Sequence, residues 1–321
     1  MQELLCSTQA YRLLKKECAE NVHSHAYLLL CNDSKNLRFV LKTFAKLFFQ
    51  TDDPSENQRR EKLIDEESFA DCPFFPADGK KLTVEDAEKI KEESLLSPVE
   101  GEKKVFLLGD FAEANPQTQN KLLKLLEEPP KGVVFLLGAT SVYPVLNTVL
   151  SRTKRLEILP FTEEEVTACL ARIYQNGYTM SALKLCAAAC GGVVGEAQSM
   201  LEGGYYKSLL EGAFSLVLTE EHRLPQVIKS VGETKYKKEL LSLLRLIFRD
   251  ALLMKMNGQP YRKALLLQAE KVRVQDVATR YSKAALLYAQ EAIAQAEMDV
   301  QFNAVFPQCI ETCMAKIRNN R

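Results

Sequence analysis

Two kinds of hydrophobic pattern alternate along the first half of the chain. Continuous apolar runs occupy 26–31 (AYLLLC), 104–110 (KVFLLGD) and 133–140 (VVFLLGAT), and RLEILP at 155–160 alternates apolar with polar residues. A short apolar run without alternation is typical of a strand buried on both faces, as in a parallel sheet covered by helices. We therefore predict four strands in this half of the chain.

Helical periodicity fills the intervals between these strands, at 36–50, 83–96 and 116–130. Thr83 with Asp86 three residues later resembles a helix N-cap, and Pro116 suits a first helical turn. The Pro129-Pro130 pair must end the third helix, because proline cannot donate the next backbone hydrogen bond. The alternation of strands and helices predicts a doubly wound α/β domain with a parallel sheet.

The strand pattern ends near Phe161, and only helical patterns follow. Thr162 precedes three acidic residues, which favours a helix start, and the periodic segment 181–190 ends on two glycines, a helix stop. Later helices carry broad apolar stripes and must pack on each other or on partner subunits. The predicted division is an α/β domain at 1–157, a small all-helical lid domain at 158–204 and a helical collar domain at 205–321.

Composition narrows the class of protein. With 46% hydrophobic and 26% charged residues, the 321-residue chain fits a globular protein and neither a disordered nor a fibrous one. Lys+Arg and Asp+Glu balance at 42 each, so no overall field draws the protein to nucleic acid, although a local basic face remains open. No apolar run reaches membrane-spanning length and the first residues do not form a secretion signal. We expect a soluble cytoplasmic protein with no membrane association.

The nine cysteines do not form a CxxC pair. Two pairs, Cys186/Cys190 and Cys309/Cys313, are spaced by four and fall on one helix face each. They are either metal ligands or buried, reduced thiols, and the presence of only three histidines favours thiols. An odd number of unpatterned thiols indicates a reducing compartment.

The segment 119–153 resembles the clamp-loader branch of the AAA+ proteins. In that family a helix ending in LEEPP precedes a strand with a polar sensor residue at its end, and a further helix closes on the tripeptide SRC. Here LEEPP stands at 126–130 and the matching tripeptide is Ser151-Arg152-Thr153. Upstream, 82–110 is similar to the family segment that leads into the Walker B strand, and HAYLLL at 25–30 matches the first strand. The resemblance covers roughly residues 20 to 200.

A working P-loop needs glycines, so that backbone N–H groups can surround phosphate, a lysine for the β- and γ-phosphates and a hydroxyl residue for Mg²⁺. Aligned without gaps to the family, the chain places other residues at all of these positions: Cys31, Ser34 and Asn36 for glycines, Leu37 for the lysine and Arg38 for the hydroxyl residue. Lys35 would be a displaced phosphate lysine, but without the glycines side chains occupy the space that phosphate needs.

The other elements of an ATP site are also missing from the sequence. Gly109 stands at the metal-binding Asp of Walker B, and we interpret the following Asp110 as a polar residue at a strand end and not as a metal ligand. Gly195-Glu196 replaces the basic sensor-2 residue of ATP-binding relatives. We therefore expect no ATP binding, no hydrolysis and no cofactor. Cys72 alone replaces the four cysteines of the family's zinc module, so no metal is expected either.

One functional element of the family is retained. The resemblance implies that Arg152, in the SR motif with Ser151, is an arginine finger for ATP bound by a neighbouring subunit. Such a finger requires a permanently charged fork aimed at the γ-phosphate. The alternative is a surface arginine that caps helix carbonyls. Thr153 keeps a small side chain where the family has cysteine, and Lys154 and Arg155 either add to the field or face solvent.

The resemblance thus implies a subunit without ATPase activity in the DNA polymerase III clamp loader. Its partners would be the gamma/tau and delta subunits and, through the complex, the sliding clamp and primed DNA. It would be the stator of a pentameric ring. Four basic residues on one helical side either face DNA or form a solvated face: Lys35, Arg38, Lys42 and Lys46. Two alternatives stay open: a divergent gamma/tau-type ATPase, and a scaffold outside replication.

Overall fold

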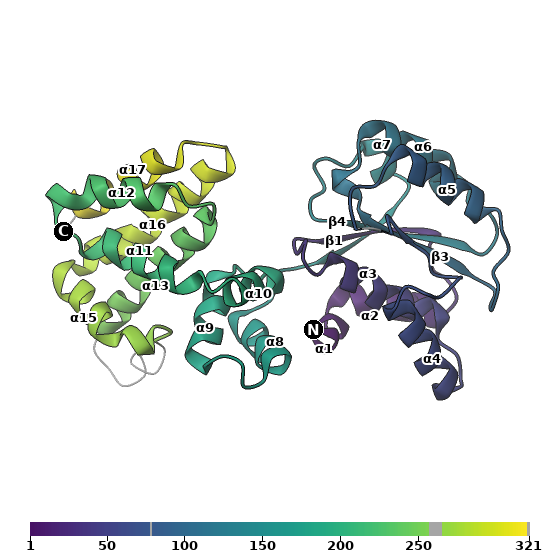
Figure 1. The fold of residues 1–321 in the computed structure, drawn as a ribbon, viewed down its shortest axis with the longest axis horizontal. Coiled ribbons are helices and arrows are strands. Elements are labelled where there is room, and N and C mark those ends of the chain that lie inside the picture. The colour runs from purple at the N-terminus through teal and green to yellow at the C-terminus, as the bar shows by residue number, and fades with distance from the viewer. Residues whose placement is uncertain (78, 257–264, 320–321) are drawn as a thin grey trace. The chain divides into compact units, whose positions relative to one another are not determined.

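The computed structural model describes residues 1–77, 79–256 and 265–319. The chain divides into two compact units, Met1–Pro160 and Phe161–Arg321 (Figure 1). Each unit has its own secondary-structure class, because the apolar runs of the first half and the amphipathic stripes of the second half call for different packing partners.

The first unit is built on a five-stranded parallel sheet. Its strands are β1 Ala26–Cys31, β2 Phe74–Phe75, β3 Lys104–Asp110, β4 Val133–Ala139 and β5 Lys154–Ile158, in the order β2-β3-β4-β1-β5. Every neighbouring pair is parallel. The four predicted strands are confirmed, and β2 escaped prediction because two residues are too few for a periodic signal.

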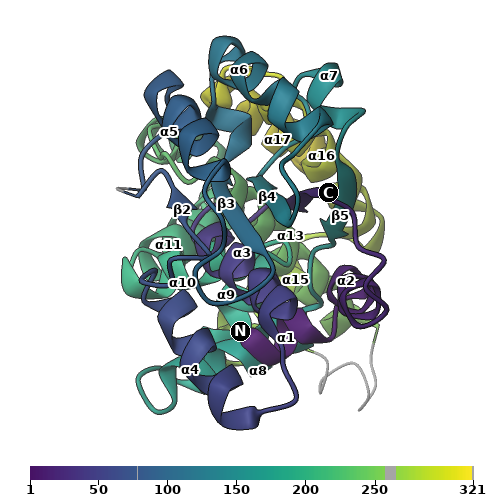
Figure 2. The same cartoon turned by 90° about the vertical axis from the view of Figure 1, so that its right-hand side faces the viewer.

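Helices cover both faces of this sheet. They are α1 Gln2–Cys6, α2 Gln9–Ala19, α3 Leu37–Ala45, α4 Pro54–Asp65, α5 Val84–Ser94, α6 Pro116–Glu127 and α7 Asn147–Leu150, with short 3₁₀ helices at Lys46–Phe49 and Phe111–Glu113. The helices α5, α6 and α7 lie on one face of the sheet, and α1, α3 and α4 lie on the other (Figure 1 and Figure 2). This arrangement confirms the predicted doubly wound α/β fold.

The core of this unit follows from the strand pattern. Because successive side chains of a strand point to opposite faces, each continuous apolar run supplies both faces at once. On the face under α5 and α6, the rings of Phe75, Phe106 and Phe135 stack with centroid separations of 6.3 and 5.4 Å. Burying one such ring contributes about 1.5–3 kcal/mol.

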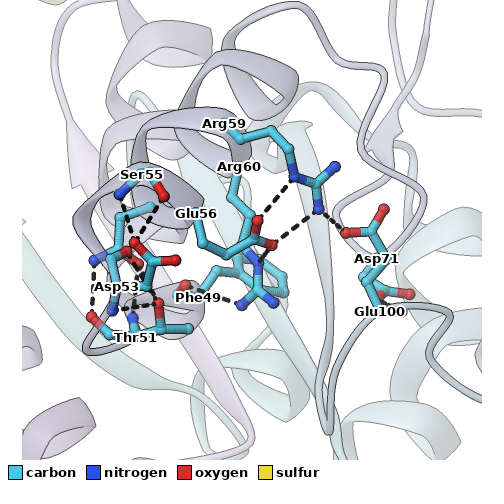
Figure 3. A network of polar contacts seen from close by, with 10 residues as sticks. Phe49, Thr51, Asp53, Ser55, Glu56, Arg59, Arg60, Asp71 and Glu100 are labelled. Atoms are coloured by element: carbon cyan, nitrogen blue, oxygen red, sulfur yellow. Dashed lines mark hydrogen bonds and ion pairs between the residues drawn. The ribbon is translucent and has the colours of Figure 1, made fainter.

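The helix α4 was not predicted, and its contacts explain why. Ile64 is its only buried residue, so it has no apolar stripe that a periodicity search would find. Polar contacts hold it instead: Arg59 lies between Glu56 of the same helix and Glu100 in the loop before β3 (Figure 3). Asp71, which is 1% exposed, accepts hydrogen bonds from the backbone N–H groups of Val99 (2.7 Å) and Glu100 (2.8 Å).

The second unit contains helices alone among its described residues. They are α8 Glu163–Tyr174, α9 Met180–Ala189, α10 Val194–Glu202, α11 Tyr206–Leu218, α12 Leu224–Gly232, α13 Lys237–Lys255, α15 Lys271–Arg280, α16 Lys283–Gln301 and α17 Phe306–Asn319, with 3₁₀ turns at Glu221–Arg223 and Gln268–Glu270. Thr162 forms a capping box with Glu165, and Gly191 and Gly192 follow α9 with φ of +59° and +82°, so the predicted helix start and stop are confirmed. The division into lid and collar at residue 204 stays a prediction.

No helix within the described ranges has both the length and the hydropathy that crossing a membrane would take.

Candidate functional site

The carboxyl ends of β1, β3 and β4 meet at one edge of the sheet, because neighbouring strands are parallel. Open α/β sheets bind their ligands at this edge. Three elements of the expected nucleotide site lie here: the loop 32–36 after β1, Asp110 at the end of β3 and Thr140 after β4. Their contacts decide what this edge can bind.

In the loop after β1, the carboxylate of Asp33 accepts hydrogen bonds from Asn36 of the same loop. Asp33 is 6% exposed, and its Oδ1 accepts a hydrogen bond from the backbone N–H of Asn36 at 3.1 Å. Its Oδ2 accepts a second bond from Asn36 Nδ2 at 2.8 Å. In a P-loop such an N–H would turn to phosphate. Here the N–H group of Asn36 is bonded to the Asp33 carboxylate, and the negative charge of that carboxylate would also repel a phosphate group.

The residue at the position expected for the phosphate lysine, Leu37, lies in the hydrophobic core. Leu37 is 3% exposed and packs against the backbone of Gly138 in β4. A Cβ placed on Gly138 would lie 2.9 Å from Cδ1 of Leu41 and 3.1 Å from Cδ1 of Leu37. Both leucines of α3 therefore pack tightly against the glycine. At the first glycine position, burial raises the pKa of Cys31 to about 12, which keeps the thiol neutral.

Arg38, at the hydroxyl position, is fixed by contacts within the first unit. Its guanidinium pairs with Glu67, donates to the carbonyl oxygens of Pro76 and Ala77 at 3.2 Å each, and stacks 3.9 Å from the ring centre of Phe74. These contacts use the guanidinium as a cross-link between α3 and the segment around β2. They leave this position without any group suited to Mg²⁺.

Two further basic residues of α3 and its 3₁₀ extension are engaged in the same way. Lys42 Nζ donates to the Asp65 carbonyl at 2.8 Å and pairs with Glu67 at 3.2 Å, and Lys46, 6% exposed, pairs with Asp65 at 2.7 Å. Together with Arg38, three of the four residues considered for a DNA-facing side are thus compensated inside the unit. The structure gives that alternative no support, because these charges are already compensated by carboxylates of the same unit.

The Glu67 carboxylate gives the first prediction. Hydrogen bonds from Arg38, and then from Lys42, hold the pKa of Glu67 below its ordinary value despite partial burial. A depressed folded pKa contributes stability above the unfolded pKa of about 4.3, and this contribution is lost as the pH falls through the folded pKa. We expect Glu67→Gln to lower the free energy of unfolding by about 1 kcal/mol at pH 7.

This difference should shrink progressively below about pH 4, since the wild-type carboxylate then becomes neutral as well. Urea denaturation of both proteins at pH 7 and at low pH measures it. Glu66→Gln is the matched control, because Glu66 forms only an exposed pair with Lys62 at 3.8 Å. An equal difference at both pH values would contradict the assignment.

Asp110 connects the ends of β3 and β4 through hydrogen bonds to its carboxylate. Its Oδ2 accepts from the Thr140 hydroxyl at 2.7 Å, and its Oδ1 accepts from the backbone N–H groups of Thr140 and Ala112 at 3.2 Å each. Gly109 lies at an irregularity of the β3–β4 register between Leu108 and Asp110. Both carboxylate oxygens therefore hold the ends of β3 and β4, which accounts for an acidic residue here without a metal.

In the second unit, the sensor-2 position is acidic. Glu196 lies in the first turn of α10, where a carboxylate suits the helix dipole. Burial raises the pKa of Glu239 on α13, and the nearby charge of Glu196 raises it further. A pair of acidic residues, Glu196 and Glu239, thus lies where the resemblance implies a cation in ATP-binding relatives.

The spaced cysteine pairs are buried within the second unit. Burial raises the pKa of Cys186 to about 12, of Cys190 to about 11 and of Cys313 to about 12, so these thiols stay protonated. Metal binding requires the thiolate. No group of three or more His, Cys, Asp or Glu residues in the described parts of the chain is placed to hold a metal ion.

Arg152 lies at the other edge of the sheet. It follows the four-residue helix α7 and precedes β5, whose first residue Lys154 pairs with Tyr27 near the start of β1. The loop 32–36 follows the last residue of β1. A strand of this length spans on the order of 15–20 Å. Arg152 therefore cannot reach the loop 32–36 of its own chain.

The guanidinium of Arg152 has one backbone contact and one carboxylate contact. Nη1 donates to the Thr148 carbonyl at 3.0 Å, which is the capping contact considered as an alternative, while Nε and Nη2 donate to Glu127 Oε2 at 3.2 and 3.0 Å. The side chain is 31% exposed. Ser151 Oγ donates to the Thr148 carbonyl at 3.1 Å. The arginine is thus oriented and remains accessible.

The neighbouring basic residue is compensated elsewhere. Lys154 forms an ion pair with the buried carboxylate of Glu17, which also accepts a hydrogen bond from Tyr27 at 2.6 Å. Thr153 Oγ1 donates to the Val149 carbonyl at 3.1 Å, so this small side chain packs within the turn. Arg155 is exposed.

Sequence reasoning did not foresee two of these contacts. The LEEPP and SR motifs were identified separately, but Glu127 of the first contacts Arg152 of the second. Asp33 in the loop after β1 was also overlooked. An acidic residue within a loop that should bind phosphate is a sequence signal that would have identified it.

Comparison with known proteins shows that the first unit is similar to subunits of DNA polymerase III. A family model described as "DNA polymerase III, delta subunit" matches residues 6–162. The delta' subunit of DNA polymerase III from Bacillus subtilis is 25% identical over 177 residues, which are 51% of this chain and 54% of that protein. The tau/gamma subunit from Haemophilus influenzae is 29% identical over 158 residues, 48% of this chain and 23% of that protein. The chain thus spans about half, or less, of the curated relatives it matches.

Among solved structures, a DNA polymerase III gamma subunit-related protein from Thermotoga maritima covers 97% of this chain and 99% of its own, with a TM-score of 0.43 and 15% identity.

Proposed function

We propose that this chain is a clamp-loader protein of the AAA+ class and the delta-prime-type subunit of a DNA polymerase III clamp loader. In this role it neither binds nor hydrolyses ATP. It completes a pentameric ring as a stator and supplies Arg152 to ATP bound by an adjacent subunit.

The observation that carries the proposal is the contrast between the two edges of the sheet. At the carboxyl edge, Asp33, Leu37 and Arg38 occupy the positions that phosphate and Mg²⁺ would require. At the amino edge, Arg152 presents a partly exposed fork. A subunit that has lost its own site but keeps this arginine can act only on a nucleotide held by another chain.

The chemistry of such a role suits arginine. During phosphoryl transfer negative charge spreads over the γ-phosphate oxygens, and a delocalised cation with a planar fork stabilises that charge. A lysine would provide a point charge without the two-pronged geometry.

The proposed partners follow from the family. They are the gamma/tau and delta subunits and, through the assembled complex, the sliding clamp and primed DNA, in the cytoplasm. A gamma/tau-type ATPase is the second candidate, since the identity to the Haemophilus influenzae tau/gamma subunit, 29%, is similar to that for delta'. A scaffold outside replication is the third.

Nucleotide binding separates the first two candidates. Because the loop after β1 lacks glycines and holds a buried carboxylate, we expect no saturable binding of a fluorescent ATP analogue by the isolated chain. Fluorescence titration with Mg²⁺ present measures this, with the gamma/tau subunit as the positive control. Saturable binding comparable to that subunit would favour the ATPase candidate. An isolated chain that neither binds nucleotide nor joins gamma/tau and delta would favour a scaffold outside replication.

A further inference from the structure

Glu127 and Arg152 come from two motifs that lie 25 residues apart in sequence and meet at the amino edge of the sheet. Glu127 is the last residue of α6, and Arg152 follows α7. One carboxylate oxygen, Oε2, accepts from both Nε and Nη2 of the guanidinium. The remaining nitrogen, Nη1, is held by the Thr148 carbonyl. All three nitrogens of the fork are therefore in contact with the protein.

The same helix also fixes the start of α7. Gln119 of α6 is fully buried; its Nε2 donates to the Pro144 carbonyl at 3.1 Å, and its Oε1 accepts from the Leu146 N–H at 2.9 Å. Leu146 is the residue immediately before α7. Thus α6 holds the arginine-bearing turn at both ends, through Gln119 before it and Glu127 after it.

Helix stability does not explain the acid at this position. The carbonyl end of a helix carries partial negative charge, so a carboxylate in the last turn is unfavourable for α6. Glu127 stands there, followed by Glu128. The positive charge of Arg152 compensates Glu127, and the benefit of the pair lies in the orientation of the arginine.

The held fork can still bind an anion. A guanidinium has five N–H donors, and the contacts to Glu127, Thr148 and Ser151 engage at most four. At least one donor on Nη2 is left for a phosphate oxygen, and the side chain is 31% exposed. Binding therefore does not require release of Glu127.

We propose that Glu127 is a positioning residue that orients Arg152 to stabilise negative charge on a neighbour's nucleotide, an inference that rests on the proposed function above. An unrestrained arginine would sample many rotamers, and misplacement by about 1 Å can cost up to about 100-fold in rate. The carboxylate removes that freedom before the neighbour's ATP arrives.

The test uses the complex reconstituted with gamma/tau, delta and clamp on primed DNA, and compares Glu127→Gln with Glu128→Gln and Arg152→Ala. We expect Glu127→Gln to lower kcat for ATP at the served site about 10-fold with KM, assembly and melting temperature unchanged. Glu128→Gln, a matched change one residue away, should leave turnover at the wild-type value. In the Arg152→Ala background, Glu127→Gln should have no further effect.

The outcomes separate the two proposals. If Arg152→Ala leaves turnover unchanged, the finger role fails and the positioning role fails with it. If Arg152→Ala lowers turnover but Glu127→Gln does not, only the positioning role is overturned. A lower melting temperature with an equal loss in both backgrounds would assign Glu127 a merely structural role and would also overturn it.

Discussion

Replacing Arg152 with alanine is expected to lower ATP turnover at the site it serves by about 10³-fold or more, while leaving ring assembly intact. The physical reason is the loss of a delocalised charge next to oxygens on which negative charge builds during phosphoryl transfer. Assembly should persist because the side chain is partly exposed, and its contacts among the described residues are to Glu127 and the 148–151 turn. Clamp- and DNA-stimulated hydrolysis by the reconstituted complex measures the effect.

Two variants control this experiment. Arg152→Lys keeps the charge and loses the fork, so we expect it to recover only part of the rate. Arg155→Ala removes an exposed arginine three residues away and should leave turnover unchanged. Full turnover in an assembled Arg152→Ala complex would refute the finger role and leave the capping contact to Thr148 as the function of this side chain.

Introducing a lysine at the P-loop position, Leu37→Lys, should destabilise the protein without restoring a nucleotide site. Leu37 is 3% exposed and packs against Gly138 and Leu41. Leu37→Lys removes buried apolar surface and places a charge in the core without a partner. We expect the free energy of unfolding to fall by roughly 3–5 kcal/mol, a large share of a typical domain's stability.

Urea denaturation of Leu37→Lys measures this loss, and Leu37→Met is the matched control. Methionine keeps nearly the same volume, so it should cost less than about 1.5 kcal/mol. We expect neither variant to bind the ATP analogue, since Asp33 and the missing glycines are unchanged. The prediction would be contradicted if Leu37→Lys were as stable as the wild type and bound nucleotide. The loop would then be a P-loop that lacks only its lysine.

The sheet could be predicted because its signal is local. Each of the runs at 26–31, 104–110 and 133–140 contains at least four consecutive apolar residues, which is typical of a strand buried on both faces. Capping residues are local as well, so Thr83 and Thr162 were identified from their neighbours three residues on. By contrast, α4 carries one buried residue and β2 has two residues, too little for either pattern.

The prediction that the nucleotide site is lost also rests on local sequence. A P-loop depends on residue types at fixed spacing, and their replacement at Cys31, Leu37 and Gly109 is visible without coordinates. The basic residues of α3 could not be interpreted in this way. Their charges on one helical side fit a DNA surface or a solvated face equally well, because their partners Asp65 and Glu67 lie on a different segment of the chain.

The sequence by itself determined the strands and the helix starts, and it predicted the loss of phosphate-binding chemistry, since each depends on residues that lie close together in the chain. The tertiary structure alone decided which charges meet. Asp110 with Thr140, Arg38 with Glu67 and Glu127 with Arg152 are pairs separated by 25 to 30 residues. Such contacts form only when strands and helices that are distant in sequence pack against each other, at either edge of the sheet. No local pattern encodes that placement.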